Sequence, residues 1–225
     1  NAIPYLQDDY ELMSFMRLLE PLGIAADTTP ADKWLDIPAD VAESIATMLP
    51  LVMNRPTVVI FPGASITEKR WGNERFRVVA EWCLAHSLQV VLVGGEAEHD
   101  AGEKIASGLN VANLIGMTTL VQTAAVIHKA ALVLSADSGV LHIAVGLGRP
   151  TVSLFGPSSI PKWAPRGPRH IVLNKHLPCS PCTRFGTTPP CPHDNRCMRE
   201  ISVKEVTRAI ESLVCDSDPE SLFPA

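Results

Sequence analysis

The chain of 225 residues carries 24 acidic and 19 basic side chains, which gives a formal net charge of −5. This acidic balance argues against a general nucleic-acid-binding protein, which carries an excess of basic side chains. A hydrophobic fraction of 46% with mixed charge predicts a packed globular protein. No apolar run approaches the roughly 18 residues that a membrane-spanning helix needs.

The first part of the chain predicts two helices joined by a linker. Residues 8–20 place apolar side chains at helical spacing, and Pro21 and Gly23 then end the helix. Residues 24–37 are rich in Pro, Asp and Thr, as expected of a linker. Residues 39–50 form a second amphipathic pattern. We therefore expect a boundary at residues 37 and 38.

From Thr57 onwards the pattern changes to strands that alternate with helices. Short apolar runs predict strands at 57–61, 89–93, 111–115, 131–135, 151–155 and 171–173. Helical patterns occupy 73–86, 97–107, 119–129, 138–147 and 203–214. Such alternation is typical of right-handed βαβ units. The sequence predicts an α/β fold with a Rossmann-like, doubly wound parallel sheet.

Ligands of such sheets bind beyond the carboxyl ends of the strands. This rule directs attention to five loops, at 62–72, 94–98, 116–119, 135–142 and 156–166. These loops hold most of the polar side chains that are candidates for a binding site.

The loop after the first strand offers donors for an anion. Gly63 permits a tight turn, Ser65 and Thr67 carry hydroxyl groups, and Lys69 brings a positive charge. The loop matches neither the phosphate-binding GxxxxGK[ST] pattern nor GxGxxG, so a dinucleotide cofactor is disfavoured. On this stretch alone, a plain surface loop is an equally good interpretation.

The loop after the fourth strand leads directly into a helix. Ser138 is placed to cap that helix, and Gly139 leaves the amides of the first turn open to an anion. Asp137 is suited to accept hydrogen bonds from sugar hydroxyls. His142 lies on the first turn; a lone histidine there is commonly a core residue, but its closeness to Asp137 favours a role in the site.

Glu96 follows Gly94 and Gly95 at the end of the second strand. A carboxylate in this position suits hydrogen bonding to a ribose diol, as in other doubly wound nucleotide sites. Taken alone, Glu96 is better explained as an acidic residue that stabilises a helix N-terminus.

Four cysteines, Cys179, Cys182, Cys191 and Cys197, lie close together in the sequence. A CxxC pair followed by two more cysteines is compatible with structural zinc, although five residues separate the second pair. Free thiols in a compact loop, or disulfides formed in vitro, are the alternatives.

Residues 160–200 are basic within an acidic chain, with seven Lys or Arg against two Asp or Glu. An ordinary solvated face explains this charge. A patch that faces an anionic acceptor or membrane headgroups is the second interpretation.

Six motifs occur in a fixed order: FPGAS at 61–65, KRW at 69–71, VGGE at 93–96, LIGMTTL at 114–120, DSGVLHIA at 137–144 and LFGP at 154–157. Together they resemble glycosyltransferase family 9, the heptosyltransferases of lipopolysaccharide core synthesis. The resemblance covers about residues 55–215, and it rests on the ordered set because each motif alone is weakly specific.

The resemblance implies one half of a GT-B architecture, in which two Rossmann-like domains face each other across a cleft. Residues 1–37 would then be the tail of an N-terminal domain and the crossing linker. Residues 38–225 would be the C-terminal domain that binds a nucleotide sugar, typically ADP-heptose. The saccharide acceptor, carried on a lipid, would sit mainly on the N-terminal domain.

The resemblance also assigns roles to single residues. The diphosphate would be held by Lys69 with the loop of Ser65 and Thr67, and by the amides at Ser138 and Gly139. Glu96 would bind the ribose and Met117 would lie beside the adenine. Asp137 would contact the sugar, and His142 would support its loop.

In this family the general base lies near the start of the N-terminal domain, so we expect no catalytic base in this chain and little activity from it alone. No metal is required, since Lys69 and a helix N-terminus stabilise charge. The enzyme would be cytoplasmic, with peripheral contact to the inner membrane. A different nucleotide-sugar donor, a non-catalytic nucleotide-sugar-binding module and a zinc-stabilised interaction module remain as alternatives.

Overall fold

The computed structural model describes residues 3–6, 9–25, 33–48, 55–184 and 186–215. Six parallel strands form one sheet in the order β3-β2-β1-β4-β5-β6. Their bounds are β1 Thr57–Phe61, β2 Gln89–Leu92, β3 Ala112–Asn113, β4 Leu132–Ala136, β5 Thr151–Leu154 and β6 His170–Leu173. This order is that of a doubly wound Rossmann-like sheet, with the change of winding direction between β1 and β4. The predicted fold class is confirmed.

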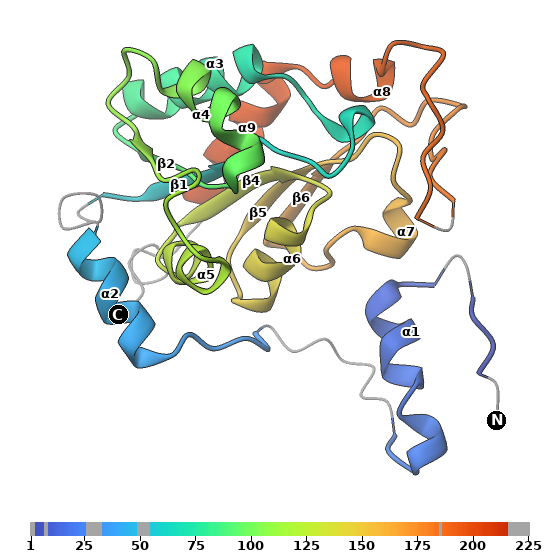
Figure 1. Ribbon diagram of the computed structural model, residues 1–225. Helices are drawn as coiled ribbons and strands as arrows, with labels where there is room; N and C mark the ends of the chain where they lie inside the picture. The colour runs from blue at the N-terminus through green and yellow to red at the C-terminus, as the bar shows by residue number, and fades with distance from the viewer. Residues whose placement is uncertain (1–2, 7–8, 26–32, 49–54, 185, 216–225) are drawn as a thin grey trace.

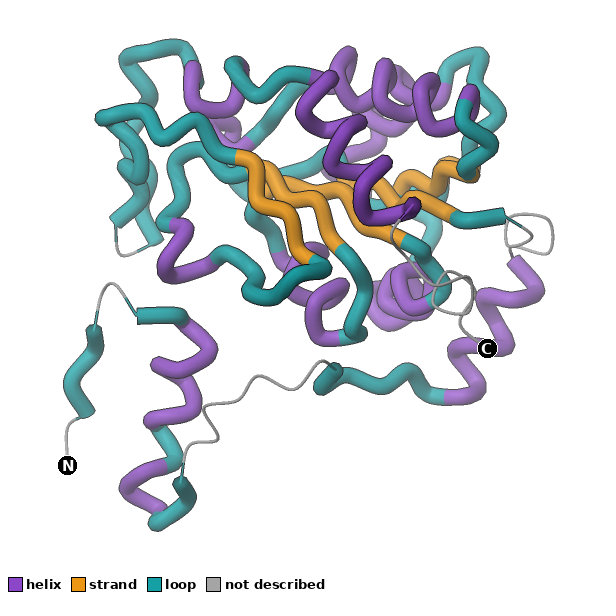
Figure 2. Tube along the Cα trace, turned by 180° about the vertical axis from the view of Figure 1, so that it is seen from behind, coloured by secondary structure: helices purple, strands orange, loops and turns teal. Residues whose placement is uncertain are grey.

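Helices cover both faces of the sheet (Figure 1). One face carries α3 (Asn73–Ala85), α4 (His99–Ala106) and α9 (Val203–Cys215), and the other carries α2 (Ala39–Met48), α5 (Leu120–His128) and α6 (Gly139–Gly146). The view from behind shows the N-terminal helix α1 (Glu11–Arg17) to one side of these layers (Figure 2). Short helices α7 (Ile160–Trp163) and α8 (Arg196–Arg199) complete the fold.

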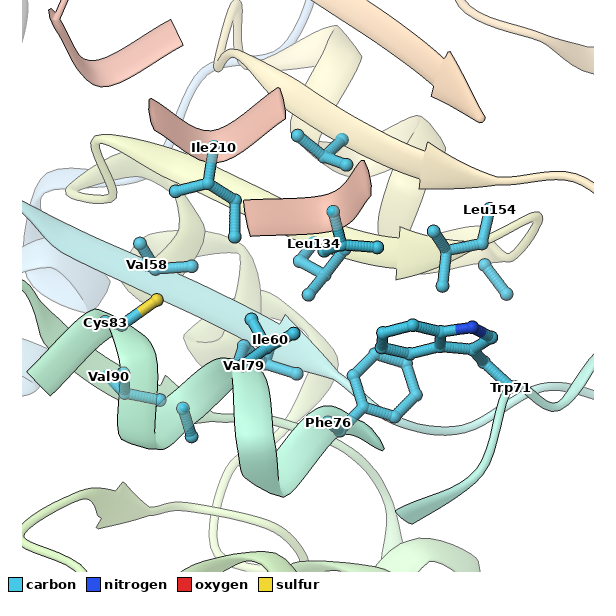
Figure 3. Packing of buried hydrophobic residues seen from close by; sticks show 14 of the residues in the cluster. Val58, Ile60, Trp71, Phe76, Val79, Cys83, Val90, Leu134, Leu154 and Ile210 are labelled. Atoms are coloured by element: carbon cyan, nitrogen blue, oxygen red, sulfur yellow. The ribbon is translucent and has the colours of Figure 1, made fainter. Parts of the chain in front are cut away.

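The larger core cluster lies between the sheet and helices α3 and α9. Val58, Ile60 and Leu134 point from the strands toward Val79 of α3 and Ile210 of α9 (Figure 3). All five side chains are buried, so their apolar surface is removed from water. Each Å² of apolar surface buried in this way stabilises the fold by about 25 cal/mol. This packing fixes the strands that carry the loops of the site.

Trp71 joins the loop after β1 to the start of α9. Its ring packs edge to face against Phe76 at 5.0 Å between centroids (Figure 3), and its Nε1 donates to the carbonyl of Ile201 at 2.8 Å. Because Trp71 is buried, this contact holds the end of the loop that carries Lys69.

Residues 34 and 35, at the end of the predicted linker, are bonded to helix α6. The backbone amides of Trp34 and Leu35 both donate to the carbonyl of Gly146, at 2.8 and 2.9 Å. A Cβ on Gly146 would approach the Leu35 side chain to 2.6 Å, so the glycine permits this close contact. The structure therefore anchors the linker at the C-terminal end of α6.

Several predicted elements are shorter than their sequence patterns. The predicted helix at 8–20 divides into α1 and a 3₁₀ turn at Glu20–Leu22, because Pro21 favours the first turn of a new helix. Strand β3 keeps two residues of the predicted five; it is an edge strand, and the Asn113 side chain accepts from the Ile115 amide at 3.3 Å. Residues 49–50 of the predicted second helix lie outside the described residues.

His170 is expected to make the protein less stable as the pH falls from about 6.5 to 4. Burial, together with the positive charge of Arg169, lowers the pKa of His170 to about 4 from its ordinary value of 6.5. Between these values the unfolded chain binds a proton that the folded chain does not, so stability is lost as pH falls through this window. Urea unfolding at pH 7.5 and at pH 4.5 measures this loss. The free energy of unfolding should fall less between these two pH values in His170→Gln than in the parent chain. An equal loss in both proteins would contradict this prediction; His99→Gln, at an exposed position, is the control.

Candidate functional site

The polar loops meet along the carboxyl edge of the sheet in the order of the strands. Met117 follows β3, Glu96 follows β2, Lys69 follows β1, Asp137 follows β4 and Ser158 follows β5. Neighbouring strands lie about 4.8 Å apart, so the three steps from β3 to β4 span roughly 14 Å. The edge is therefore an elongated row of polar groups.

Asp137 is the centre of the row. Its Oδ2 atom accepts from Lys69 Nζ and from Ser158 Oγ, both at 2.6 Å. Its Oδ1 atom lies 3.7 Å from His142 Nε2. The structure thus brings together three predicted residues, Asp137, His142 and Lys69, although Lys69 and Asp137 are 68 positions apart in the sequence. It also adds Ser158 to this group.

The partners of Asp137 keep its carboxyl group ionised. Burial alone raises the pKa of this group, but the contacts with His142, Lys69 and Ser158 outweigh that effect and lower the pKa to about 2. The pair of Lys69 and Asp137 is therefore charged at neutral pH, and the remaining ammonium hydrogens of Lys69 are available to another acceptor.

The N-terminus of α6 adjoins Asp137. Ser138 caps the helix, as predicted, by accepting from the Leu141 amide at 3.3 Å, and its hydroxyl also bonds Ser135 at 2.8 Å. A Cβ on Gly139 would meet nothing within 4 Å, so the approach to the first turn is open. The helix dipole places partial positive charge in this open space.

Glu96 and Met117 lie together at the other end of the row. A Cβ on Gly116 would come within 2.8 Å of Glu96 Oε2, which shows that the carboxylate lies against the residue before Met117. Gly116 has φ +74°, a left-handed conformation that glycine adopts without strain. Met117 is 63% exposed, so its side chain is available to an apolar surface of a ligand.

Ser65 and Thr67 share the loop of Lys69 but are exposed. Thr67 begins and Lys69 ends the 3₁₀ turn at Thr67–Lys69. Both hydroxyls therefore lie on the stretch that places the lysine. Among the described residues, neither hydroxyl forms a hydrogen bond with Asp137.

Two further residues belong to this edge and were not identified from the sequence. Ser158 is buried and donates to Asp137; its position in a predicted ligand loop was the available signal. Glu98 accepts from the Gly95 amide at 3.0 Å, and a Cβ on Gly63 would come within 2.6 Å of its side chain. Gly63, and Gly94 with a Cβ distance of 3.1 Å to Glu98, therefore make room for a side chain that nothing in the local sequence singles out.

The four clustered cysteines differ in their exposure. Cys179 is exposed, whereas Cys197 is buried beside Gly156, and both thiols are free. Across the described residues, no group of three or more His, Cys, Asp or Glu side chains is arranged to hold a metal ion. Structural zinc at Cys179, Cys182, Cys191 and Cys197 therefore stays a prediction, with free thiols in a compact loop as the alternative.

The basic segment at 160–200 is largely neutralised. Four of its seven cations form ion pairs: Lys162 with Glu11, Lys175 with Glu205, Arg196 with Glu200 and Arg199 with Asp194. This pairing favours the interpretation of an ordinary solvated face. No helix within the described ranges is long and apolar enough to cross a membrane.

The fold and the edge define a class of protein, namely Rossmann-like domains with an open helix N-terminus and a lysine at the point where the winding changes. The sequence pattern of glycosyltransferase family 9 (heptosyltransferase) matches residues 11–191. The chain belongs to that family.

Three relatives illustrate the similarity. Lipopolysaccharide heptosyltransferase 2 of Escherichia coli K12 is 36% identical over 122 residues, which is 51% of this chain and 35% of the relative. The solved E. coli ADP-heptose lipopolysaccharide heptosyltransferase II has a TM-score of 0.66 at 26% identity, over 80% of this chain and 53% of its own.

The solved family 9 glycosyltransferase of Veillonella parvula has a TM-score of 0.77 at 23% identity, over 95% of this chain and 63% of its own. The chain therefore spans about a third to two thirds of the length of these relatives.

Proposed function

We propose that this chain is the nucleotide-sugar-binding, C-terminal part (residues 38–225) of a GT-B heptosyltransferase, preceded by the tail of an N-terminal domain and a linker (1–37). Its donor is ADP-heptose or a close analogue. The observation that carries this proposal is the ordered row of Met117, Glu96, Lys69 and Asp137 along one edge. The relative from E. coli named for ADP-heptose shares the fold and the family.

The row matches the order of groups in such a donor. Met117 offers an apolar, polarisable surface to the adenine, and Glu96 beside it accepts from the ribose hydroxyls. Lys69 and the open N-terminus of α6 then receive the diphosphate, with Ser65 and Thr67 as hydroxyl donors nearby. Asp137 receives hydroxyls of the sugar, and His142 supports it from the other oxygen.

The proposed reaction is an inverting transfer to a saccharide of the lipopolysaccharide core. An acceptor hydroxyl, deprotonated by a base outside this chain, attacks the anomeric carbon as the bond to the diphosphate breaks. Lys69 and the dipole of α6 stabilise the negative charge that grows on the leaving diphosphate, so the chemistry requires no metal. Because the base lies elsewhere, this chain alone binds donor but transfers poorly. Such an enzyme would work in the cytoplasm, in peripheral contact with the inner membrane that holds its lipid-linked acceptor.

Calorimetry with ADP, GDP and UDP, without added metal, tests the proposed donor. Selective binding of ADP supports the assignment. Selective binding of GDP or UDP would keep the site and change the nucleotide. If none of the three binds, the donor-site proposal is wrong for this chain.

The role of Glu96 gives a second, sharper test. Glu96→Ala should weaken ADP binding by roughly 10- to 100-fold, because hydrogen bonds to a charged group contribute about 1.5–3 kcal/mol. The same substitution should leave 2′-deoxy-ADP, which lacks one ribose hydroxyl, much less affected. Asp100→Ala, at an exposed acidic position on α4, is the control. Equal losses for both ligands would remove Glu96 from the ribose site.

A further inference from the structure

A half-open cavity lies beside the site, on the far side of His142. Its volume is about 290 Å³. Aromatic rings dominate its walls, with one lysine among them: Tyr10, Phe15, Trp34, His142, Lys162 and Trp163. The rings of His142 and Trp163 lie 6.0 Å apart at a tilt of 55°. None of the roles proposed for the donor uses the wall that Trp163 and the N-terminal helix provide.

The two walls of the cavity come from parts of the chain about 150 residues apart, and charged contacts join them. Lys162 Nζ of α7 lies 2.5 Å from Glu11 Oε2 of α1 and 4.3 Å from the centre of the Tyr5 ring. Arg166 lies 4.4 Å from the centre of the Tyr10 ring. The cavity therefore has a defined shape.

The position of the cavity relative to Asp137 indicates which ligand group reaches it. Lys69 contacts Oδ2 of Asp137, whereas His142 contacts Oδ1 and also lines the cavity. A ligand with its diphosphate at Lys69 and its sugar at Asp137 would thus have the cavity next to that sugar. Because the acceptor hydroxyl attacks the anomeric carbon of the donor sugar, the sugar that receives the transferred group must also lie next to it.

We propose that this cavity is a subsite for one uncharged pyranose ring of the saccharide acceptor; the proposal rests on the proposed function. Aromatic faces suit the C–H face of a pyranose, while Glu11, Lys162 and His142 line the cavity with hydrogen-bonding groups. The volume is near the lower limit of ligand pockets, about 300 Å³, so it admits a single ring rather than an extended chain. Lys162 is already paired with Glu11, which disfavours an anionic occupant.

Saturation-transfer NMR on the 225-residue chain tests this subsite. Methyl α-glycosides of glucose, mannose and galactose, at millimolar concentration and with ADP present, are the probes. Irradiation of the aromatic protons should transfer signal to at least one probe. Phe15→Ala and Trp163→Ala should each raise the Kd for that probe by about 3- to 10-fold. Trp163→Phe should retain most of the binding.

Leu18→Ala is the matched control. Leu18 directly follows the last residue of α1 and is 59% exposed, against 58% for Phe15, but it does not line the cavity. Phe15 is outside the buried core, so its variant tests the subsite without disturbing the fold. Calorimetric binding of ADP to every variant separates the two proposals. If ADP binds but no pyranoside does, or if binding survives both alanine variants, the subsite is wrong and the proposed function stands.

If the parent chain itself does not bind ADP, the proposed function is contradicted instead. Competition identifies the occupant. A pyranoside displaced by ADP-heptose but not by ADP would assign the cavity to the donor sugar and overturn the acceptor subsite.

Discussion

The Lys69→Ala variant is expected to bind ADP about 100-fold more weakly than the parent chain while its affinity for adenosine stays nearly unchanged. Hydrogen bonds to charged groups contribute about 1.5–3 kcal/mol. In the loop after β1, Lys69 is the basic residue that contacts Asp137. Its removal also leaves the buried carboxylate of Asp137 without its 2.6 Å partner, so the site becomes repulsive toward a diphosphate. Both effects act on the diphosphate and neither acts on the nucleoside.

Calorimetry with ADP, AMP and adenosine on each protein measures this difference. Arg70→Ala removes the neighbouring, exposed cation and should change ADP affinity little. If Lys69→Ala weakened adenosine as much as ADP, the lysine would hold the fold of the site rather than the diphosphate. A double variant with Asp137→Asn would then show whether the lost affinity comes from the lysine or from the unpaired carboxylate.

The Trp71→Ala variant is expected to lose about 3–5 kcal/mol of unfolding free energy, the usual cost of removing a large buried aromatic side chain. The substitution removes the ring contact with Phe76 and leaves the carbonyl of Ile201 without its indole donor. Trp71→Phe keeps most of the apolar contact and should lose about 1–3 kcal/mol for the unpaired carbonyl. Urea unfolding followed by circular dichroism measures both values.

Trp82→Ala provides the matched control on the same face of the sheet. Trp82 stacks on His86 at 4.1 Å and is only partly buried, so its loss should cost much less. Similar losses for the two tryptophans would show that Trp71 is not a special link between the loop and α9. Trp71→Ala should also weaken ADP binding, because Lys69 lies two residues before the anchor.

The sequence was sufficient for the layers and for the general place of the site. Continuous apolar runs such as 57–61 identify buried parallel strands because both faces of the sheet are covered, and the rule on strand ends then selects the loops. Ser138 illustrates a local prediction that is confirmed, since a serine before a helix caps it through its own hydroxyl.

Long-range contacts were beyond reach of the same reasoning. The bond from Ser158 to Asp137 depends on how β4 and β5 align, and the contact of Glu98 with Gly63 depends on the pairing of β1 with β2. The cysteine spacing left the choice between a metal site and free thiols open for a related reason, because spacing restricts distance along the chain but not the direction of each thiol. Edge strand β3 was overestimated since apolar residues continue past the point where its single neighbour stops pairing.

Helix α6 connects residues 34 and 35 to the carboxyl edge of the sheet. Its eight residues form a rod of about 12 Å, with Ser138 just before its first residue and Gly146 as its last. Trp34 and Leu35 are bonded to the carbonyl of that last residue. A displacement of residues 34 and 35 would therefore either break two backbone hydrogen bonds or carry the helix with it. If the donor binds as proposed, a shift along the helix axis would move the open first-turn amides relative to the diphosphate, and would so couple this segment to the charge that stabilises the leaving group.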